Sequence, residues 1–497
     1  MYEVAAIWFI VLAGIALSVR SRSSDSEGCA PTVWSLIPWV GGALQYGKDS
    51  IRYLNQCRTH YGSAFKMVLA GRVITVICDT KGIDNIFRDR SKAFNTHLAH
   101  HQIAEAMGNV KRANDIVHII NDRLLPLVTR ALSREGLDKI VPAFNEDIGR
   151  SIEAMARQVR NSPNGKAISL LPFVSESIYH AVSKAAFGPL FPFDTYDDFE
   201  ACDADLVLLI SRIPILSRNV LKAQGRYLHA LMDYMRRGWS EGHLEGASAM
   251  ISDLVSVLKD TDLDESDIAG TLFTIVWGMQ ANTMRIPYWI LVFLLNDPAA
   301  AARVQEEVDR EIRDNFGGDI KRFLATPYTA LESHFPLVDS CVKEALRIGI
   351  LQSALRQAHA DTEIISETGR VRIRKGDIIM ANISAFHMDP EVFEDPRTFR
   401  ADRYLNDKKK IHLGFGGGSH LCKGRFLAMH VAKVFVVMCF KMFDMKLVDA
   451  SGKSAIGNLP PPDTRRSISV LRPSSEVELF VHARIRGEKD GSLLFSS

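Results

Sequence analysis

The chain has 497 residues, of which 47% are hydrophobic, and a formal net charge of +2. It is long enough to bury a large core, and it has no long Lys/Arg run that would indicate nucleic-acid binding. Its seven cysteines are odd in number, widely spaced and without a Cys-x-x-Cys pair. They argue against a disulfide framework and a cysteine-rich zinc site, and favour a reducing compartment.

Residues 1–22 predict a membrane anchor. Residues 4–19 carry no charge, and Arg20 and Arg22 follow them. A run of this length is close to the lower limit for a spanning helix, and positive charge after it predicts that the remainder stays in the cytosol. The alternative is a cleaved secretory signal, because residues 16–18 resemble a cleavage site. Such a signal, however, has its positive charge before the apolar part.

The remainder is predicted to be one large, mainly helical domain. Residues 23–43 are a polar linker and a proline-rich lead segment, and residues 44–497 form the domain. Alternation over residues 63–78, rich in Val and Ile, predicts a β-hairpin turning at Ala70-Gly71. Helical patterns dominate from there to about residue 314.

One long apolar helix is predicted over residues 264–295, kinked or opened by Pro287. Residues 371–380 and 467–471 are predicted to be short strands. A further helix is predicted over residues 423–443.

A glycine-rich stretch, FGGGSHLCKGR at residues 415–425, carries Cys422 directly before that last helix. Glycines let the backbone approach a flat ligand closely, and a helix N-terminus favours the thiolate form of a cysteine. The pattern suits a metal-ligating thiolate. A buried, inert cysteine and a reactive nucleophile are the alternatives, although no partner histidine is fixed by the local sequence.

Two further patterns contain charged residues. Glu344 and Arg347 lie three residues apart on a predicted helix, so they share one face and can pair; an ordinary surface ion pair would also fit. Pro396, Phe399 and Arg403 follow in an irregular passage with Asp-Pro steps.

Together, these motifs resemble those of the cytochrome P450 superfamily of haem-thiolate enzymes, and they occur in the family's order. The family's FxxGxRxCxG loop is matched by Phe415, Gly418, His420, Cys422 and Gly424, with histidine at the place of the commoner arginine. The resemblance implies a mainly α fold with small β-sheets, formed by a single large haem domain behind an N-terminal transmembrane helix.

The resemblance also implies roles for individual residues. Cys422 would be the axial ligand of haem b iron, and Glu344, Arg347 and Arg403 would form a structural charge cluster. The cofactor-binding residues would be Arg356, Phe415, Gly418, His420 and Gly424. Lys111, Arg112 and His118 are open alternatives for a further propionate contact.

The family activates dioxygen on its long helix, where an acid usually precedes a threonine. Here Thr283 is present, but Asn282 replaces the acid. An amide can orient water but cannot ionise, so Thr283 and Asn282 are predicted to be catalytic through ordered water. A threonine in a helix can also simply bond a preceding carbonyl.

Residues 277–283 and 459–473 resemble the branch that holds cholesterol 7α-hydroxylase, sterol 12α-hydroxylase and prostacyclin synthase. We therefore expect a monooxygenase that oxidises a lipophilic substrate such as a sterol or terpenoid. Its partners would be NADPH-cytochrome P450 reductase, a small lipophilic substrate and a membrane, and no nucleic acid is expected. The expected substrate-facing residues are Val276, Gln280, Leu351, Leu355 and Ile468.

The expected location is the endoplasmic reticulum membrane, with a single span and a cytosolic catalytic domain. Leu206–Leu221 is apolar and is expected either to enter the membrane or to form an ordinary buried helix pair. The general style of the sequence resembles fungal secondary-metabolism members. The alternatives in function are a redox-independent isomerase or dehydratase acting on an endoperoxide or epoxide, and a non-catalytic haem carrier.

Overall fold

The computed structural model describes residues 28–484 except 29, 36, 38, 90–91, 163, 214, 350–352, 406–411 and 466–469. Most of these residues are helical and the sheets are small, which confirms the predicted fold class. The predicted anchor at residues 1–22 lies outside the described residues. Within the described part, no helix is both long enough and apolar enough to cross a bilayer.

The chain forms two compact units, which are described separately. The sheet unit comprises the described residues of segments 1–100, 350–397 and 413–422. The helical unit comprises those of segments 101–349, 398–412 and 423–497.

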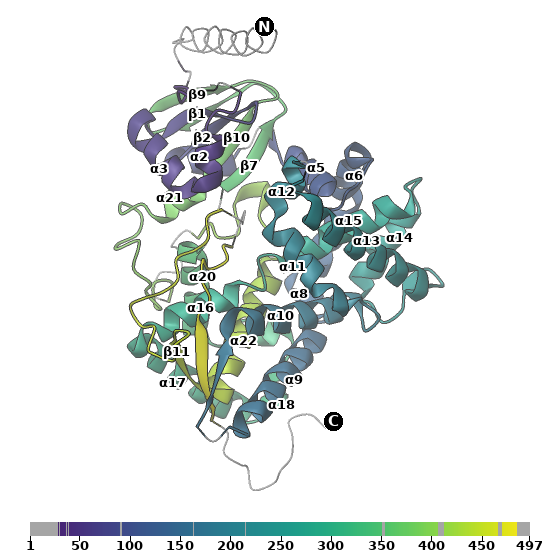
Figure 1. Cartoon of the computed structure of the whole chain (residues 1–497), viewed down its shortest axis with the longest axis vertical. Coiled ribbons are helices and arrows are strands. Elements are labelled where there is room, and N and C mark those ends of the chain that lie inside the picture. Colours follow the sequence, from purple (N-terminus) through teal and green to yellow (C-terminus); the bar gives the residue numbers. More distant parts are fainter. Residues whose placement is uncertain are drawn as a thin grey trace. The chain divides into compact units, whose positions relative to one another are not determined.

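The sheet unit is built on five strands in the order β1-β2-β10-β7-β3. Strand β10 runs parallel to β2 and antiparallel to β7, and β8 and β9 form a separate hairpin. Figure 1 shows α3 beside this sheet. The elements are α2 (Ala43–Lys48), α3 (Ser50–Tyr61), β1 (Ala64–Leu69), β2 (Arg72–Ile77), α4 (Thr80–Phe87), β3 (Phe94–Asn95), β7 (Ser353–Ala358), β8 (Thr362–Ser366), β9 (Gly369–Ile373), β10 (Ile378–Asn382) and α21 (Ile383–His387).

The predicted hairpin of residues 63–78 is confirmed. Strands β1 and β2 pair antiparallel up to Leu69 and Arg72, and Ala70 and Gly71 between them both have positive φ, 49° and 82°. Two residues of positive φ give the tight turn that matches the twist of paired strands. The single strand predicted over residues 371–380 is instead divided between β9 and β10, because Gly376 adopts a φ of 93° between them.

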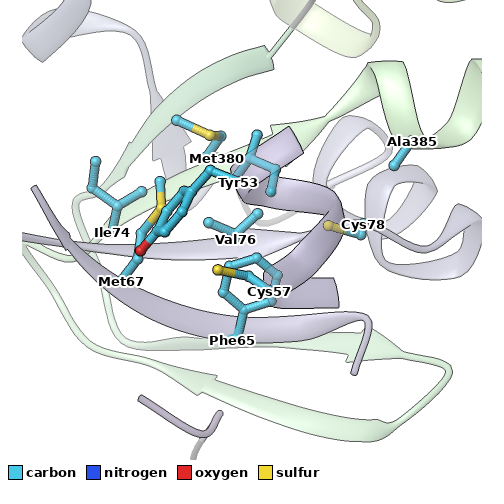
Figure 2. Close-up of a cluster of buried hydrophobic side chains, with 10 residues drawn as sticks. Tyr53, Cys57, Phe65, Met67, Ile74, Val76, Cys78, Met380 and Ala385 are labelled. Atoms are coloured by element: carbon cyan, nitrogen blue, oxygen red, sulfur yellow. The ribbon is translucent and has the colours of Figure 1, made fainter. Parts of the chain in front are cut away.

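The core of the sheet unit lies between α3 and the sheet. Most of its buried residues come from α3, β1, β2 and β10. Two others are Cys78, which directly follows β2, and Ala385 of α21 (Figure 2). The alternation of β1 and β2 directs every second side chain toward α3. The core residues are Tyr53, Leu54, Cys57, Phe65, Met67, Ile74, Val76, Cys78, Met380 and Ala385.

The helical unit holds most of the chain (Figure 1). Its helices are α6 (Ala113–Ile119), α7 (Leu125–Ala131), α8 (Arg134–Leu137), α9 (Val141–Arg160), α10 (Leu170–Phe187), α11 (Tyr196–Ala204), α12 (Leu206–Ser211), α13 (Arg218–Gly238), α14 (Ala249–Lys259), α15 (Glu265–Gln280), α16 (Ile286–Leu295), α17 (Pro298–Phe316), α18 (Ile320–Leu324), α19 (Tyr328–Leu331), α20 (Pro336–Gly349) and α22 (Arg425–Met442). Helix α5 (His97–Ala106) precedes them. Strands β11 (Phe443–Val448), β12 (Glu478–Ala483) and β4 (Lys166–Ser169) form a small sheet, and β5 (Trp239–Ser240) pairs with β6 (His243–Leu244).

Side-chain caps explain where several of these helices begin. The carboxylate of Asp264 accepts from the backbone N–H of Asp267 at the start of α15, and that of Asp297 accepts from Ala299 and Ala300 at the start of α17. Such caps satisfy amides that have no partner inside the helix. Helix α22 confirms the helix predicted over residues 423–443. It is buried on nearly every side among α9, α16, α17 and α20.

The prediction of one long helix over residues 264–295 is wrong in one respect, because the structure has two helices there. Helix α15 ends at Gln280, residues 281–285 form turns, and α16 begins at Ile286. Pro287 lies in the first turn of α16, where its missing N–H costs nothing. The chain therefore leaves the helix before the proline.

Candidate active site

The loop before α22 is closed by its own backbone. The N–H of Cys422 donates to the carbonyl of Phe415 at 3.0 Å, and the N–H of Leu421 donates to the carbonyl of Gly418 at 3.2 Å. Gly418 has a φ of 68°, and a Cβ there would overlap the carbonyl oxygen of Phe87. Only glycine combines that conformation with so close an approach. The backbone conformation and the contact with Phe87 thus explain why position 418 of this loop holds a glycine.

Cys422 differs from the other described cysteines in its exposure. Its side chain is exposed, whereas the five others are buried. Burial raises the pKa of Cys78 to about 11 and that of Cys202 to about 12, and it also raises the pKa of the remaining three. These five thiols therefore stay protonated at neutral pH, and Cys422 is the described cysteine open to a ligand. The five are Cys57, Cys78, Cys202, Cys341 and Cys439.

A buried cation lies beside a hollow near this loop. The guanidinium of Arg356 on β7 is 7% exposed, donates to the carbonyl of Leu355 at 2.8 Å, and lies 5.7 Å from the centre of the Phe87 ring. Burial lowers its pKa to about 10. Within the described residues no carboxylate forms an ion pair with this guanidinium, so it can pair with an acidic group of a ligand.

The same hollow is lined by two other basic residues, Lys92 and His420, and by one acidic residue, Asp89, whose carboxylate accepts from the backbone N–H of Ala93. His420 is half-buried: its Nε2 lies 3.4 Å from the carbonyl oxygen of Phe94 and its Nδ1 lies 3.5 Å from the Thr96 hydroxyl. A neutral ring with the proton on Nε2 satisfies both contacts. An acidic group in this hollow can pair with Arg356, whose guanidinium stays charged at neutral pH although its pKa is lowered.

The predicted charge cluster is present in the helical unit. Arg347 donates two hydrogen bonds of 2.8 Å to the carboxylate of Glu344, and Arg403 Nε donates to the same carboxylate at 2.8 Å. All three side chains are buried, with Glu344 and Arg347 at 0% exposure. The backbone N–H of Arg400 also donates to Glu344. A bidentate pair with a second guanidinium fixes the segment of Arg403 to α20.

Thr283 lies in the turn between α15 and α16. Elsewhere on α15, the hydroxyls of Thr271 and Thr274 donate to the carbonyls four residues earlier. Thr283 is buried, yet no hydrogen bond of its hydroxyl is seen within the described part of the chain. The backbone ladder is also interrupted here. Ala281 and Met284 bond carbonyls four residues back, but no such bond is seen for the N–H of Asn282 or Thr283 among the described residues.

Asn282 has a fixed partner. Its side-chain oxygen accepts from the backbone N–H of Val470 at 3.0 Å. The amide therefore holds the C-terminal segment with its oxygen, and its NH₂ group can still donate to water.

The predicted substrate-facing residues are found in different places. Val276 is fully buried in α15, and Leu355 packs partly against the core of the sheet unit. Gln280 is fully buried too: its NH₂ donates to the carbonyl of Tyr179 and to the Ser183 hydroxyl on α10. No described residue donates to its side-chain oxygen. This arrangement holds Gln280 against α10. Leu351 and Ile468 lie outside the described residues.

Two other predictions concern basic residues before α6. Lys111 lies 3.6 Å from Asp264, and Arg112 pairs with Asp115 and Asp262. These ion pairs give both cations acidic partners within the chain, in contrast to Arg356.

The sequence analysis missed a buried group of charges next to Thr283. Arg285 is 1% exposed and pairs with Glu200 and Asp203 of α11, and Arg472 contacts the same two acids. An arginine within an apolar run was the only signal in the sequence, and it did not identify the partners some 80 residues earlier.

The residues of the sheet unit fit a haem group. An exposed thiol on a glycine loop can ligate iron, and the buried guanidinium without a carboxylate suits a propionate. These two observations, rather than the family's motifs, are the structural evidence for the cofactor.

Comparison with known proteins identifies the family. The family model "Cytochrome P450" matches residues 31–475. The chain is 26% identical over 506 residues to cytochrome P450 7A1 of Sus scrofa, covering 93% of this chain and 95% of that protein. It is 26% identical over 520 residues to 5-beta-cholestane-3-alpha,7-alpha-diol 12-alpha-hydroxylase of Sus scrofa, covering 97% of each.

A third relative is cholesterol 7-alpha-monooxygenase of Cricetulus griseus, 24% identical over 522 residues, which cover 96% of this chain and 98% of that protein. These relatives match the branch expected from residues 277–283. They give no support to the expected role in secondary metabolism. With the family model matched over most of its length, the chain belongs to the cytochrome P450 family, whose members are haem-thiolate monooxygenases.

Proposed function

We propose that this cytochrome P450 hydroxylates or otherwise oxidises a lipophilic, multi-ring substrate such as a sterol, with electrons from an NADPH-dependent reductase. The observation that carries the proposal is the state of Thr283. This residue lies where the helical hydrogen-bond pattern is interrupted, and its hydroxyl forms no hydrogen bond with the described residues. The names of the relatives, which are sterol hydroxylases and monooxygenases, support the substrate class.

Cys422 would hold the iron of haem b through its thiolate. Arg356 would bind a propionate, His420 would contribute to the same hollow, and Phe415, Gly418 and Gly424 would shape the loop. A thiolate-ligated haem supplies the chemistry of dioxygen activation and O–O cleavage. The residues of the chain supply its binding, its orientation and the path of protons.

Thr283 is the proposed proton donor of the oxygen site. A hydroxyl can accept a proton from water and pass one on through the same oxygen. The hydroxyl of Thr283 is available for this because it does not bond back to a carbonyl, as Thr271 and Thr274 do. Asn282 would orient water through its NH₂ group, since its oxygen is held by Val470.

We expect Thr283→Ala to uncouple the enzyme. NADPH should still be oxidised through the reductase, but product per NADPH should fall by about tenfold or more, because a proton-transfer group contributes roughly 10²–10⁴-fold, and peroxide should rise. The measurement is the yield of product and peroxide against NADPH oxidised, with a panel of sterols and terpenoids as substrates.

Asn282→Asp should retain turnover, because a carboxylate oxygen can still accept from the N–H of Val470. Thr274→Ala is the control, since its hydroxyl already bonds a carbonyl of α15. Equal coupling in Thr283→Ala and the wild type would contradict the proposed role. Turnover without reductase or NADPH would instead support the redox-independent isomerase.

The membrane is proposed as a partner on the evidence of two segments. Residues 1–22 carry the apolar run, and Leu206–Leu221 exposes large apolar side chains in the structure, with Ile215 at 89% and Leu216 at 62%. Leu206 and Leu209 are buried, so one side of the segment faces the core and the other is exposed. Exposed apolar clusters of this kind mark membrane or protein contacts.

Deleting residues 1–22 should therefore release the protein from endoplasmic reticulum membranes only in part, with an intact haem spectrum. Adding Ile215→Ser and Leu216→Ser should release most of the rest. Each of these side chains, when it enters the apolar part of the membrane, contributes about 2 kcal/mol to binding. Flotation with membranes measures both steps. Full release by the deletion alone would show that Leu206–Leu221 does not bind the membrane. Glycosylation of the catalytic domain would contradict its proposed cytosolic orientation.

A further inference from the structure

A group of four charges, two of them buried and two partly buried, joins three segments of the helical unit. Glu200 and Asp203 come from α11, Arg285 comes from the first turn before α16, and Arg472 comes from the C-terminal segment. Arg285 lies 2.9 Å from Asp203 and 3.1 Å from Glu200, and Arg472 lies 2.8 Å from Glu200. With two carboxylates and two guanidiniums, the group is neutral as a whole.

Asp203 contacts both sides of the break that contains Thr283. One of its oxygens accepts from the indole N–H of Trp277 on α15 at 2.9 Å, and the other lies 2.9 Å from Arg285. Arg285 in turn donates to the carbonyl of Ala281 at 2.6 Å, which is the first carbonyl of the break. One carboxylate on α11 thus connects the last turns of α15 with the residue that precedes α16.

The C-terminal segment adds a third attachment to the same place. The N–H of Val470 donates to Asn282, and the indole of Trp289 donates to the carbonyl of Leu471 at 2.7 Å. Arg472 then contacts the backbone carbonyl of Glu200 and the carboxylate of Asp203. Residues 281–285 are therefore held from α11 and from the C-terminal segment at once.

Because Arg285 is buried, its position depends on its ion pairs with Glu200 and Asp203. Its side chain is 2% exposed. Burial alone would lower the pKa of Arg285, but the charges of Asp203 and Glu200 more than offset this and its pKa is raised. A buried guanidinium that lost a partner would have to move toward another acceptor or toward water. Its bond to Ala281 would move with it.

We propose that Asp203 is a positioning residue, which sets the geometry of the Asn282–Thr283 turn through Trp277 and Arg285. The inference rests on the proposed role of Thr283 in proton delivery. It also implies that displacement of α11 changes proton delivery, because α11 and the turn share this carboxylate. A purely structural role would affect only how much folded protein is obtained.

The test compares two substitutions of the same kind on α11. Asp203→Asn keeps an oxygen for the indole of Trp277 but removes the charge that faces Arg285. Asp198→Asn is the matched control, because Asp198 pairs with the exposed Arg226 on α13, away from the break. Both are made in the full chain and compared as haem-containing protein with matched carbon monoxide spectra.

Two quantities are measured. The first is product per NADPH oxidised, which should fall by about tenfold in Asp203→Asn, as expected for a displaced reacting group, and stay at the wild-type value in Asp198→Asn. The second is amide hydrogen exchange of the peptide that covers residues 277–289, which should rise in Asp203→Asn alone. Asp203→Glu should recover part of the coupling, since it restores the charge.

Wild-type coupling and wild-type exchange in Asp203→Asn would overturn the inference, and so would equal losses in Asp203→Asn and Asp198→Asn. If Asp203→Asn yields no haem protein, Trp277→Phe decides, because it removes the bond to Asp203 without touching a charge. Unchanged exchange in that variant would overturn the inference too.

The outcome for Thr283→Ala separates this inference from the proposed function. If Thr283→Ala uncouples the enzyme and Asp203→Asn does not, the positioning role is wrong and the proton-delivery role stands. If Thr283→Ala leaves coupling unchanged, the proposed function fails, whatever Asp203→Asn does.

Discussion

Cys422→Ser is expected to abolish both the thiolate-type carbon monoxide difference spectrum and the activity. A serine hydroxyl stays protonated at neutral pH and cannot donate electron density to iron as a thiolate does. The loss should be complete rather than partial, because Cys422 is the only exposed thiol among the described cysteines. The measurement is the difference spectrum of the purified variant at matched protein concentration.

Serine at Cys202 or Cys439 is the control, since both thiols are buried and protonated. These variants should keep the spectrum and lose about 1 kcal/mol of stability, as point changes commonly do. A normal thiolate-type spectrum in Cys422→Ser would show that another residue ligates the iron.

Glu344→Gln is expected to have the second largest effect, on the yield of folded holoenzyme. The neutral amide would remove the charge that Arg347 and Arg403 share at Glu344, and breaking a buried ion pair costs about 3–5 kcal/mol. The variant should accumulate little haem-containing protein and unfold at a lower temperature. Haem content per protein and the thermal unfolding midpoint are the measurements.

Asp402→Asn is the matched control on the same segment. Asp402 pairs with Arg303 at 3.1 Å, but both side chains are largely exposed. Such a pair contributes about 0–1 kcal/mol, so haem content should not change. If Glu344→Gln retained wild-type haem content and stability, the buried cluster would not have the structural role assigned to it.

Local patterns predicted part of the fold well. The turn at Ala70-Gly71 needs positive φ at two successive residues, and the alternation around it indicates strands, so the hairpin follows from the sequence alone. The helix after Cys422 follows from an apolar run without a break. Glu344 and Arg347 could be paired because three residues bring two side chains to one face of a helix.

Contacts between distant segments could not be predicted in this way. Asp203 and Arg285 are 82 residues apart, and only the packing of α11 against the break brings them together. Likewise, Pro287 suggested a kink at the proline, whereas the chain leaves the helix at residue 281, and Arg285 and Asn282 in this turn bond α11 and the C-terminal segment. The motifs therefore pointed to candidate residues, whose roles stay predictions, but they did not point to the groups that hold the turn of Thr283.

The central claim is that the enzyme inserts an oxygen atom from dioxygen into its substrate. The most direct test is an incubation with reductase, NADPH and isotopically labelled dioxygen, followed by mass spectrometry of the products from a sterol and terpenoid panel. We expect a product that carries one labelled oxygen atom and forms only when NADPH is present. An unlabelled product that forms equally without NADPH would contradict the claim.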